Sequence, residues 1–509
     1  MTYIPTIGLE IHTELKTKTK MFCGCDNDFN EKHPNINVCP ICLGHPGTLP
    51  VINKKAVESV LKLGLALGGN PPSAPSKGIS KFDRKNYFYP DLPKGYQISQ
   101  YDQPLISGGQ LNGIRLTRIH LEEDAARLAH QTKNPRLPSP DGEVIGGQEK
   151  LKTKSYSLVD FNRAGVPLME LVTEPDIKDG KKAVEFAKEL QLVLRYLEIS
   201  DADMEKGQMR IEANISVSKD GKLGTKVEIK NLNSFRAAGE AIDYEIKRQS
   251  EVLDRGEQVE HETRGWDENK KNTVSQRSKE KAHDYRYFPE PDLPPLDFNE
   301  SNAIDLRKLR IEIPELPANK RKRFIEEYRL SSEQVEVLVS ESSTAQYFEE
   351  SVSELLEELQ SEKSEKKKIE AMMLLFNYLT SDIRGLANEK GVSVKDINIT
   401  PENFADLIVL IIKGEITSRL AKDILKEMSL TGLDPWQIIQ DKGLGQISDE
   451  KIIKEIIKEI VSENQKAVED YKKGKENVLQ FLFGQVMGKL KGQANPDVLR
   501  NLLQEELRK

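Results

Sequence analysis

The chain has 509 residues, of which 31% are charged and 37% are hydrophobic, a composition that excludes collagen-like, disordered and disulfide-scaffold proteins. Its 75 basic and 82 acidic side chains give a net charge of −7, which excludes a uniformly basic nucleic-acid binder but leaves room for a local basic patch. No secretory signal is visible, and the apolar runs are far shorter than the roughly 20 residues of a membrane helix. We therefore expect a cytoplasmic protein of about three domains with no membrane partner.

The first predicted element is a strand over residues 7–15. Side chains alternate along a strand, so Glu10, His12 and Glu14 share one face while Leu9 shares the other with its apolar neighbours. Two carboxylates and an imidazole on one face suit a metal site, but the acidic outside of a half-exposed sheet gives the same pattern.

All four cysteines lie in the next segment, at positions Cys23, Cys25, Cys39 and Cys42. Two close pairs of thiols can close one tetrahedral metal site, and a reducing compartment disfavours disulfides. We predict a structural Zn²⁺ site, because four thiolates leave no ligand position for a catalytic water. Four unrelated buried thiols are the alternative.

Further along, apolar spacing predicts helices over residues 53–67, 181–197 and 235–253. Residues 209–216 and 226–230 form the predicted strands of a hairpin around an Asp-Gly turn. The polar face of this hairpin carries cations, carboxylates and an amide, namely Arg210, Glu212, Asn214, Ser216, Glu228 and Lys230. Cross-strand charge pairing explains that face as well as anion binding does.

Two acidic positions are unusual for their surroundings. Glu170 lies in the apolar run 168–172, where a carboxylate is costly unless it is paired or metal-bound. Residues 120–124 place three successive carboxylates beside an imidazole. Such crowding is tolerable when a divalent cation neutralises it, and carboxylate oxygens suit Mg²⁺ held with substrate phosphates. A structural ion pair and a solvated acidic turn are the alternatives.

A nucleotide or nucleic-acid surface is indicated by residues 81–91, which interleave three cations with aromatic side chains. The sequence has no P-loop, no kinase catalytic loop and no nucleophile elbow. A nucleotide-using enzyme would therefore need another phosphate-binding fold. From Pro314 onward the pattern becomes helical, so we predict an α+β domain over residues 1–295, a helical region over 296–400 and a helical tail over 401–509.

Several of these segments together resemble the B subunit of the tRNA-dependent amidotransferase. The resemblance rests on residues 7–12, 81–91, 120–124, 159–163, 284–292 and 491–496. It implies a glutamine-synthetase-like catalytic domain with an antiparallel sheet and a zinc-binding insertion at 23–42, followed by an all-helical linker and a tRNA-binding tail. It also implies a ligase that uses ATP to phosphorylate the carboxylate of Glu-tRNA(Gln) or Asp-tRNA(Asn). Ammonia from a glutaminase A subunit then displaces the phosphate, and a C subunit joins A to B.

The same resemblance implies roles for single residues. The magnesium ligands would be Glu10, His12, Glu123 and Glu170, with Lys85 as a cation of the site, and the nucleotide side would be lined by Glu212, Asn214, Glu228 and Lys230. Glu212 stands where the family usually has Asp, and residues 131–153 look like an insertion. The four cysteines match the zinc-bearing members of the family.

The tail carries a local surplus of lysines, Lys472, Lys473, Lys475, Lys489 and Lys491. We expect this basic patch to contact the tRNA backbone, although a solvated helix face accounts for the charges equally well. Two other functions stay open: a non-catalytic zinc-containing RNA-binding scaffold, and a ligase that acts on a small molecule. Compared with the scaffold, only the enzyme needs Glu10, His12, Glu123 and Glu170 to converge on one point.

Overall fold

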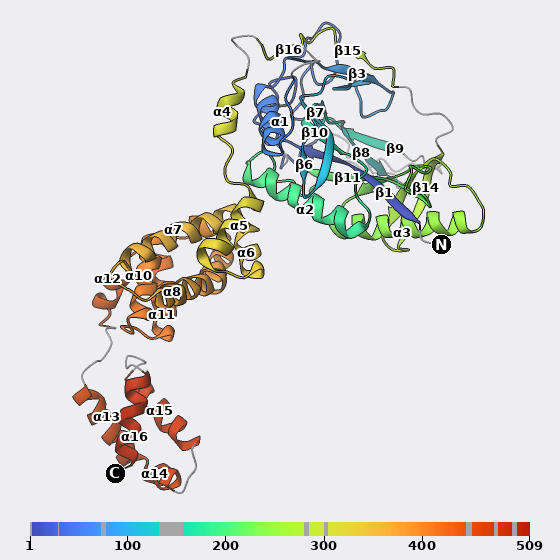
Figure 1. Ribbon diagram of the computed structural model, residues 1–509. Helices are drawn as coiled ribbons and strands as arrows, with labels where there is room; N and C mark the ends of the chain where they lie inside the picture. The colour runs from blue at the N-terminus through green and yellow to red at the C-terminus, as the bar shows by residue number, and fades with distance from the viewer. Residues whose placement is uncertain are drawn as a thin grey trace, which may run out of the picture. The chain divides into compact units, whose positions relative to one another are not determined.

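The computed structural model describes residues 3–28, 30–72, 78–131, 156–278, 285–299, 304–443, 450–472, 477–490 and 496–508. The chain divides into two compact units, Met1–Leu316 and Pro317–Lys509, whose elements are labelled in Figure 1. The division into three domains at 295 and 400 stays a prediction. The predicted insertion at 131–153 lies, apart from its first residue, outside the described residues.

A nine-stranded sheet forms the centre of the first unit. In spatial order its strands are β14 (Asn272–Ser278), β13 (Glu262–Asp267), β12 (Val227–Leu232), β11 (Met209–Ser218), β1 (Ile4–Glu14), β10 (Pro167–Thr173), β7 (Ile114–Glu123) and β5 (Ile106–Ser107), with β6 (Gln110–Leu111) paired to β7. Every neighbouring pair is antiparallel except β12 and β13, which are parallel. The predicted α+β class is confirmed, with a sheet that is mixed rather than wholly antiparallel.

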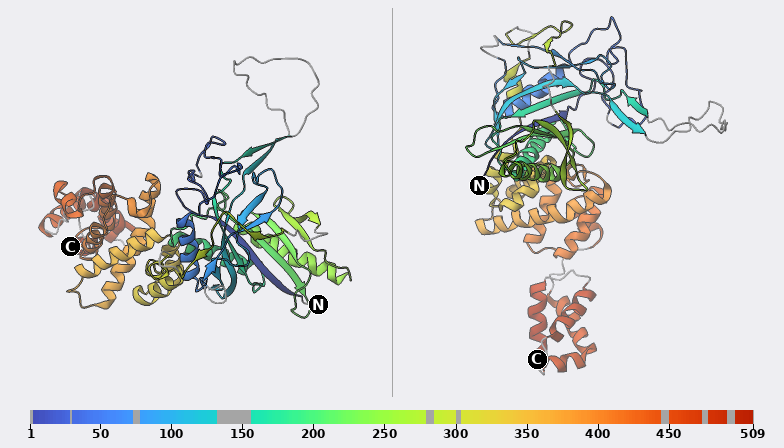
Figure 2. Two further views of the ribbon diagram at one scale, coloured as in Figure 1. Left: turned by 90° about the horizontal axis from the view of Figure 1, so that it is seen from above. Right: turned by 90° about the vertical axis from the view of Figure 1, so that its right-hand side faces the viewer.

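One face of this sheet is apolar and covered by helices. Along β1, Ile7, Leu9 and Ile11 are fully buried, whereas Glu10 and His12 lie half-buried on the opposite face. On the apolar side α2 (Gly180–Tyr196) and α3 (Phe235–Asp254) pack against each other, and α3 packs against β11 and β12. Figure 2 shows these two helices along one side of the sheet. A third helix, α1 (Lys54–Ala66), packs against β5 and β7.

The helices α1, α2 and α3 confirm the three helical segments predicted for the first unit, and local capping signals fix where each one starts. Asn53, Asp179 and Ser234 each accept a hydrogen bond from a backbone N–H in the first turn of the helix that follows. The helices α2 and α3 approach closely at Gly180, where an added Cβ would lie 2.4 Å from the carbonyl oxygen of Gly239. That contact requires a residue without a side chain.

Smaller sheets border the polar face of the central sheet. A three-stranded sheet has the order β15 (Phe288–Pro289), β3 (Asp83–Asn86) and β4 (Tyr96–Ser99), and β4 contacts β7. Two strand pairs complete the unit, β8 (Arg127–Gln131) with β9 (Tyr156–Asp160) and β2 (Ile79–Ser80) with β16 (Leu296–Asp297). A short helix, α4 (Leu306–Ile311), packs on α1.

Every described element of the second unit is helical, as the sequence predicts. The helices are α5 (Pro317–Tyr328), α6 (Ser332–Val339), α7 (Ser342–Glu358), α8 (Glu365–Tyr378), α9 (Arg384–Lys390), α10 (Pro401–Ile412), α11 (Ser418–Thr431), α12 (Pro435–Asp441), α13 (Glu450–Glu463), α14 (Gln465–Lys472), α15 (Asn477–Lys489) and α16 (Pro496–Leu507). A π-helical turn joins α8 to α9, and a 3₁₀ turn follows α9. A hydrophobic cluster holds α13, α15 and α16 together.

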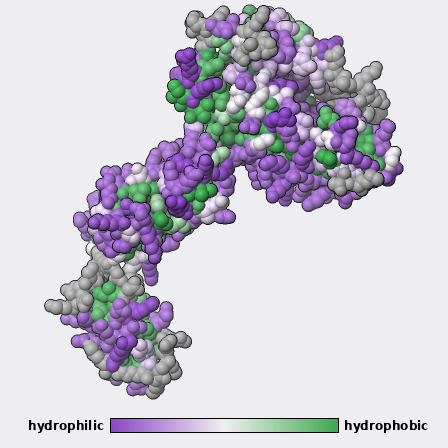
Figure 3. All heavy atoms as spheres, viewed as in Figure 1, coloured by the Kyte–Doolittle hydropathy of each residue, from purple (hydrophilic) through white to green (hydrophobic). Residues whose placement is uncertain are grey.

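Hydrophilic side chains dominate the face of both units seen in Figure 3, with small hydrophobic patches between them. Within the described residues, no helix combines the length and the apolar character that crossing a membrane requires.

Candidate active site

The polar face of the central sheet brings together side chains that are far apart in the sequence. The strand register sets Glu10 opposite Glu212, His12 opposite Glu170, and Glu170 opposite His120. Directly opposed residues of neighbouring strands point to the same face. The alternating polar residues of β12, β11, β1, β10 and β7 therefore form one continuous polar surface.

A first cluster on this surface consists of His12, Glu122 and Glu170. The Nε2 atom of His12 lies 3.3 Å from Oε2 of Glu170 and 3.6 Å from Oε1 of Glu122, and Nε2 of His120 lies 3.5 Å from Oε2 of Glu170. One ligand atom from each of the first three residues lies within 4.8 Å of the others. Ser99 donates a hydrogen bond of 3.1 Å to Glu122 and fixes its position from β4.

Charges in this cluster are strongly coupled. Burial lowers the pKa of His12, but a hydrogen bond to Glu170 and the nearby carboxylates raise it to about 9. Burial lowers the pKa of His120 to about 4, so this imidazole is neutral at physiological pH. Burial raises the pKa of Glu122, while the imidazoles of His120 and His12 outweigh burial and hold that of Glu170 well below its usual value.

A second cluster consists of the carboxylates of Glu10, Glu212 and Glu228, which also offer ligand atoms within 4.8 Å of one another. Lys230 Nζ donates to Glu212 at 2.8 Å and lies 3.3 Å from Glu228. Asn214 donates to Glu10 at 3.0 Å. The structure thus brings together all four residues predicted for the nucleotide side, and Glu10 lies with them.

The donor atoms of both clusters fit divalent cations. Burial and the Glu170, Glu212 and Glu228 carboxylates raise the pKa of Glu10, and a bound cation would oppose that effect. The buried Oδ1 atom of Asn214, beside Glu10, has no hydrogen-bond partner among the described residues. Carboxylate and amide oxygens are the ligands that Mg²⁺ prefers. The all-oxygen second cluster suits that ion, and the first cluster adds an imidazole nitrogen.

Lys85, the predicted cation of the site, faces the first cluster. Burial opposes its charge, but the Glu122 carboxylate, Tyr287 and the Glu170 carboxylate raise its pKa above the usual value. Its Nζ atom lies 5.2 Å from the ring centroid of Tyr285. The lysine is therefore a protonated group that is attracted by the Glu122 and Glu170 carboxylates and lies beside an aromatic ring.

Glu123 is not brought to either cluster. It follows Glu122 at the end of β7, and because side chains alternate along a strand, its side chain points away from that of Glu122. The Glu123 carboxylate pairs with Lys94 and accepts a 2.9 Å hydrogen bond from the backbone N–H of Ile98. Glu122, which we did not select from the sequence, lies in the first cluster instead. The signal was available, because alternation along the strand puts Glu122 on the face of His120.

The four cysteines form a compact group. One sulfur atom from each lies within 4.8 Å of the other three, and all four are free thiols. Four thiolates around Zn²⁺ at about 2.3 Å stand about 3.8 Å apart, so the group fits a tetrahedral zinc site. A hydrogen bond from Cys23 lowers the pKa of Cys42 to about 5. Lys20 is fully buried beside it, with Nζ 3.8 Å from Cys42 Sγ and 3.2 Å from the carbonyl oxygen of Phe161.

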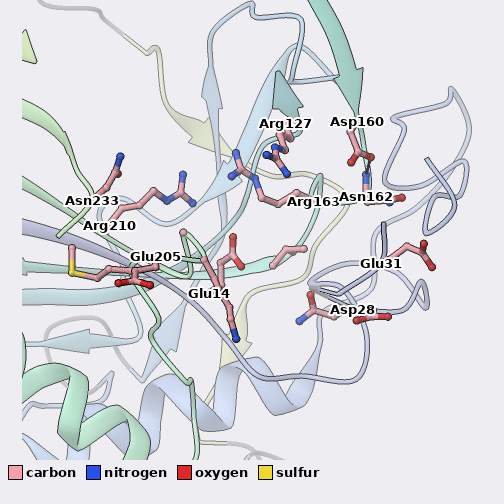
Figure 4. Close-up of a pocket in the computed structure, with 15 residues that line it drawn as sticks. Glu14, Asp28, Glu31, Arg127, Asp160, Asn162, Arg163, Glu205, Arg210 and Asn233 are labelled. Carbon is pink, nitrogen blue, oxygen red and sulfur yellow. Dashed lines mark hydrogen bonds between the residues drawn. The ribbon is translucent and has the colours of Figure 1, made fainter. Parts of the chain in front are cut away.

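A cavity of about 640 Å³ is lined mainly by polar residues, among them Glu14, Arg127, Arg163 and Arg210, and by no residue of the first cluster (Figure 4). Arg210 is paired with His12 in the strand register and donates a 2.6 Å hydrogen bond to Asp124. Burial and the Asp124 carboxylate raise the pKa of Glu14 to about 8. This volume suits part of a substrate, and our site prediction contained none of the residues that line the cavity.

In the predicted basic patch of the tail, Lys489 is the member whose side chain is described. Its Nζ atom lies 2.6 Å from Oε1 of Glu459 and 3.9 Å from Oε1 of Glu463. The side chains of the remaining members lie outside the described residues: Lys472, Lys473, Lys475 and Lys491. Contact of this patch with tRNA stays a prediction.

Comparison with known proteins gives matches along the whole chain. Residues 5–303 match the family model of the GatB/GatE catalytic domain, and residues 365–507 match that of the GatB domain. The chain is 43% identical over 517 residues to the B subunit of the aspartyl/glutamyl-tRNA(Asn/Gln) amidotransferase of Thermotoga petrophila, covering 100% of this chain and 99% of that protein. Identity to the B subunits of the same name from a Thermoanaerobacter species and Persephonella marina is 44% and 42%, covering 100% of each chain.

Proposed function

The chain belongs to the family of aspartyl/glutamyl-tRNA(Asn/Gln) amidotransferase B subunits, and from this membership we propose that it catalyses ATP-dependent amidation of Glu-tRNA(Gln), Asp-tRNA(Asn) or both. It is thus a component of a ligase-type amidotransferase. A free carboxylate does not accept ammonia until one of its oxygens becomes part of a leaving group. In the proposed reaction the γ-phosphoryl group of ATP is transferred to the side-chain carboxylate of the aminoacyl residue, and ammonia then displaces phosphate to form the amide.

The observation that carries this proposal is the convergence of the two carboxylate clusters and Lys85 on one polar face. Such a surface needs no protein nucleophile, since phosphoryl transfer depends on positioning and on charge stabilisation. We assign Mg²⁺ to His12, Glu122 and Glu170 and to Glu10, Glu212 and Glu228, where it would supply the positive charge that ATP phosphates require. Glu122 takes the place that the resemblance had given to Glu123.

Two lysines and one amide of the polar face have proposed roles. The protonated Lys85, close to Glu122 and Glu170, would attract the acceptor carboxylate and the phosphoryl oxygens between them. Lys230 bridges Glu212 and Glu228 and would hold those carboxylates in place on the nucleotide side. Asn214, hydrogen-bonded to Glu10, would do the same for the third carboxylate of that cluster.

We propose that ammonia comes from another subunit, because the four cysteines gather into one group that could hold a metal ion rather than into a nucleophile–base pair. We propose a glutaminase A subunit as its source and a C subunit as the link between A and B. The zinc site would be structural, and the lysines of the tail would bind the tRNA backbone.

Hydrolysis of ATP tests the proposal. The amidotransferase complex is supplied with Mg²⁺, ATP, ammonium and misacylated tRNA, and phosphate release is followed together with amide formation. We expect hydrolysis that depends on Mg²⁺ and rises with misacylated tRNA. Absence of hydrolysis would support the non-catalytic RNA-binding scaffold, and hydrolysis indifferent to tRNA would support a small-molecule ligase.

A matched pair of variants ties the activity to the polar face. Glu170→Gln removes a carboxylate of the first cluster while keeping its shape, and we expect a loss of roughly 100-fold or more in the hydrolysis rate. Glu174→Gln is the control, because Glu174 follows the same strand but binds Thr117 instead. Equal rates for the two variants would contradict the assignment of the site.

A further inference from the structure

Five tyrosine rings form a continuous aromatic surface next to the first cluster, in the order Tyr89, Tyr87, Tyr285, Tyr287 and Tyr101. Successive ring centroids lie 5.9, 5.8, 6.1 and 4.4 Å apart, and the last pair is stacked with an interplanar angle of 11°. We call this set the tyrosine strip. It follows β3 and β4 and precedes β15, so residues nearly 200 positions apart in sequence are joined in one surface.

The ends of the strip are open to solvent, and its middle lies over the reactive groups. Tyr89 is 51% exposed and Tyr101 is 56% exposed, while the neighbouring Phe88 is 80% exposed. In the middle of the strip, Lys85 Nζ lies 5.2 Å from the ring centroid of Tyr285 and 6.0 Å from that of Tyr87. Large exposed aromatic side chains are unusual on a soluble surface and mark binding sites when they are contiguous.

The strip lies on the acceptor side of the proposed site. It belongs to the β15–β3–β4 sheet, which contacts β7 through the hydrogen bond from Ser99 to Glu122. The proposed nucleotide side is formed by β11 and β12, beyond β10 and β1 in the order of strands. A molecule held on the strip therefore reaches Lys85 and Glu122 from the edge of the face opposite to Glu212 and Glu228.

The length of the tyrosine strip and its aromatic character indicate which ligand it binds. Tyr89–Tyr87, Tyr87–Tyr285 and Tyr285–Tyr287 meet edge to face, at interplanar angles of 64°, 65° and 75°, so the rings free to stack on a ligand are the exposed Tyr89 and Tyr101 at the two ends of the strip. One adenine ring covers one of these ends, whereas a segment of unpaired bases can stack on both, as in single-stranded nucleic-acid sites. The 3′ end of an aminoacyl-tRNA is unpaired and carries the esterified amino acid. We infer that the tyrosine strip binds the unpaired 3′ end of the aminoacylated RNA by base stacking and delivers the carboxylate to Lys85. This inference rests on the proposed function.

Leucine and phenylalanine variants at the exposed ends of the strip test it in the complete amidotransferase complex. Tyr89→Leu and Tyr101→Leu keep an apolar side chain but remove the ring, and we expect the KM for misacylated tRNA to rise roughly 5- to 100-fold. The KM for ATP should stay within about twofold, since the nucleotide binds elsewhere. Tyr89→Phe and Tyr101→Phe retain the ring and are expected to retain the wild-type KM.

Trimmed RNA provides a second measurement that does not depend on catalysis. Removing the unpaired 3′ nucleotides from tRNA should weaken binding to the wild-type complex, and the Leu variants should bind intact and trimmed tRNA equally. If the Leu variants raise the KM for ATP, the strip holds the adenine of ATP and the inference is overturned. It is also overturned if they lose affinity for trimmed and intact tRNA alike, or for neither. Failure of the proposed function would show separately, as wild-type complex that hydrolyses no ATP.

Discussion

The sharpest prediction concerns Glu122 and Glu123, two neighbouring carboxylates whose side chains point in opposite directions. Glu122 faces His12 and Glu170, whereas Glu123 is paired with Lys94. We therefore expect Glu122→Gln to weaken the dependence of ATP hydrolysis on Mg²⁺ and Glu123→Gln to leave it unchanged. The two substitutions are chemically identical and one residue apart, so each is the control of the other.

The magnitude follows from the spacing of the ligand atoms in the first cluster, which is at most 4.8 Å. Two unit charges at that distance interact by about 3.5 kcal/mol at an effective dielectric constant of about 20. Neutralising one carboxylate removes at least one such interaction with a cation bound in the cluster, and desolvation offsets part of it. A loss of about 3 kcal/mol corresponds to roughly 100-fold weaker Mg²⁺ binding.

The assay is a Mg²⁺ titration of tRNA-stimulated ATP hydrolysis by the complete amidotransferase complex. We expect the midpoint to shift roughly 100-fold for Glu122→Gln, while Glu123→Gln keeps the wild-type midpoint and loses only stability with its ion pair to Lys94. A shifted midpoint for Glu123→Gln together with a normal one for Glu122→Gln would refute the reasoning from strand alternation.

Three further predictions concern the zinc group, one buried acid and the tail. Cys39→Ser should abolish the zinc that elemental analysis detects and lower the melting temperature. At temperatures where the variant is still folded, its kcat for ATP hydrolysis should equal that of the wild type. A large fall in kcat at those temperatures would contradict a structural role. Burial and the Asp434 carboxylate raise the pKa of Asp406 to about 6, so the free energy of unfolding falls as pH rises through roughly 4 to 6 and stays at the lower value above that range. Asp406→Asn should therefore stabilise the helical transition by about 1 kcal/mol at pH 7.5 and less at pH 4, as measured by circular dichroism; an equal gain at both values would contradict the assignment. Lys489→Glu should weaken tRNA binding and reduce its salt dependence by about one unit of slope, whereas Lys422→Glu, another surface lysine paired with a carboxylate, should not.

Strand and helix patterns could be predicted from the sequence because they depend on local chemistry. Alternation along β1 places Glu10 and His12 on the face opposite Leu9, and the caps of α1, α2 and α3 are short-range signals. The order of strands could not be predicted, because the position of β1 between β11 and β10 is set by long-range packing. The partners of each carboxylate depend on that order.

Two details of the site also depend on long-range packing. Lys94 lies in a turn without distinctive sequence pattern, so its ion pair with Glu123 could not be predicted from the chain alone. The tyrosine strip joins residues from two distant segments, and only the pairing of β15 with β3 makes them adjacent. The side-chain direction of Glu123, in contrast, could be predicted from the sequence, because strand alternation from His120 puts Glu122 rather than Glu123 on the face of that histidine.

The buried side chain of Lys20 beside Cys42 would protect a zinc-loaded cysteine group from oxidation. Four thiolates around a divalent ion carry an excess of two negative charges, and a protonated Lys20 would cancel one of them at the buried side of the group, where Cys42 lies. Oxidising the sulfurs to disulfides would erase that negative charge and leave the ammonium without a counterion in the interior, at a cost of several kcal/mol. The fold therefore penalises oxidation of the loop.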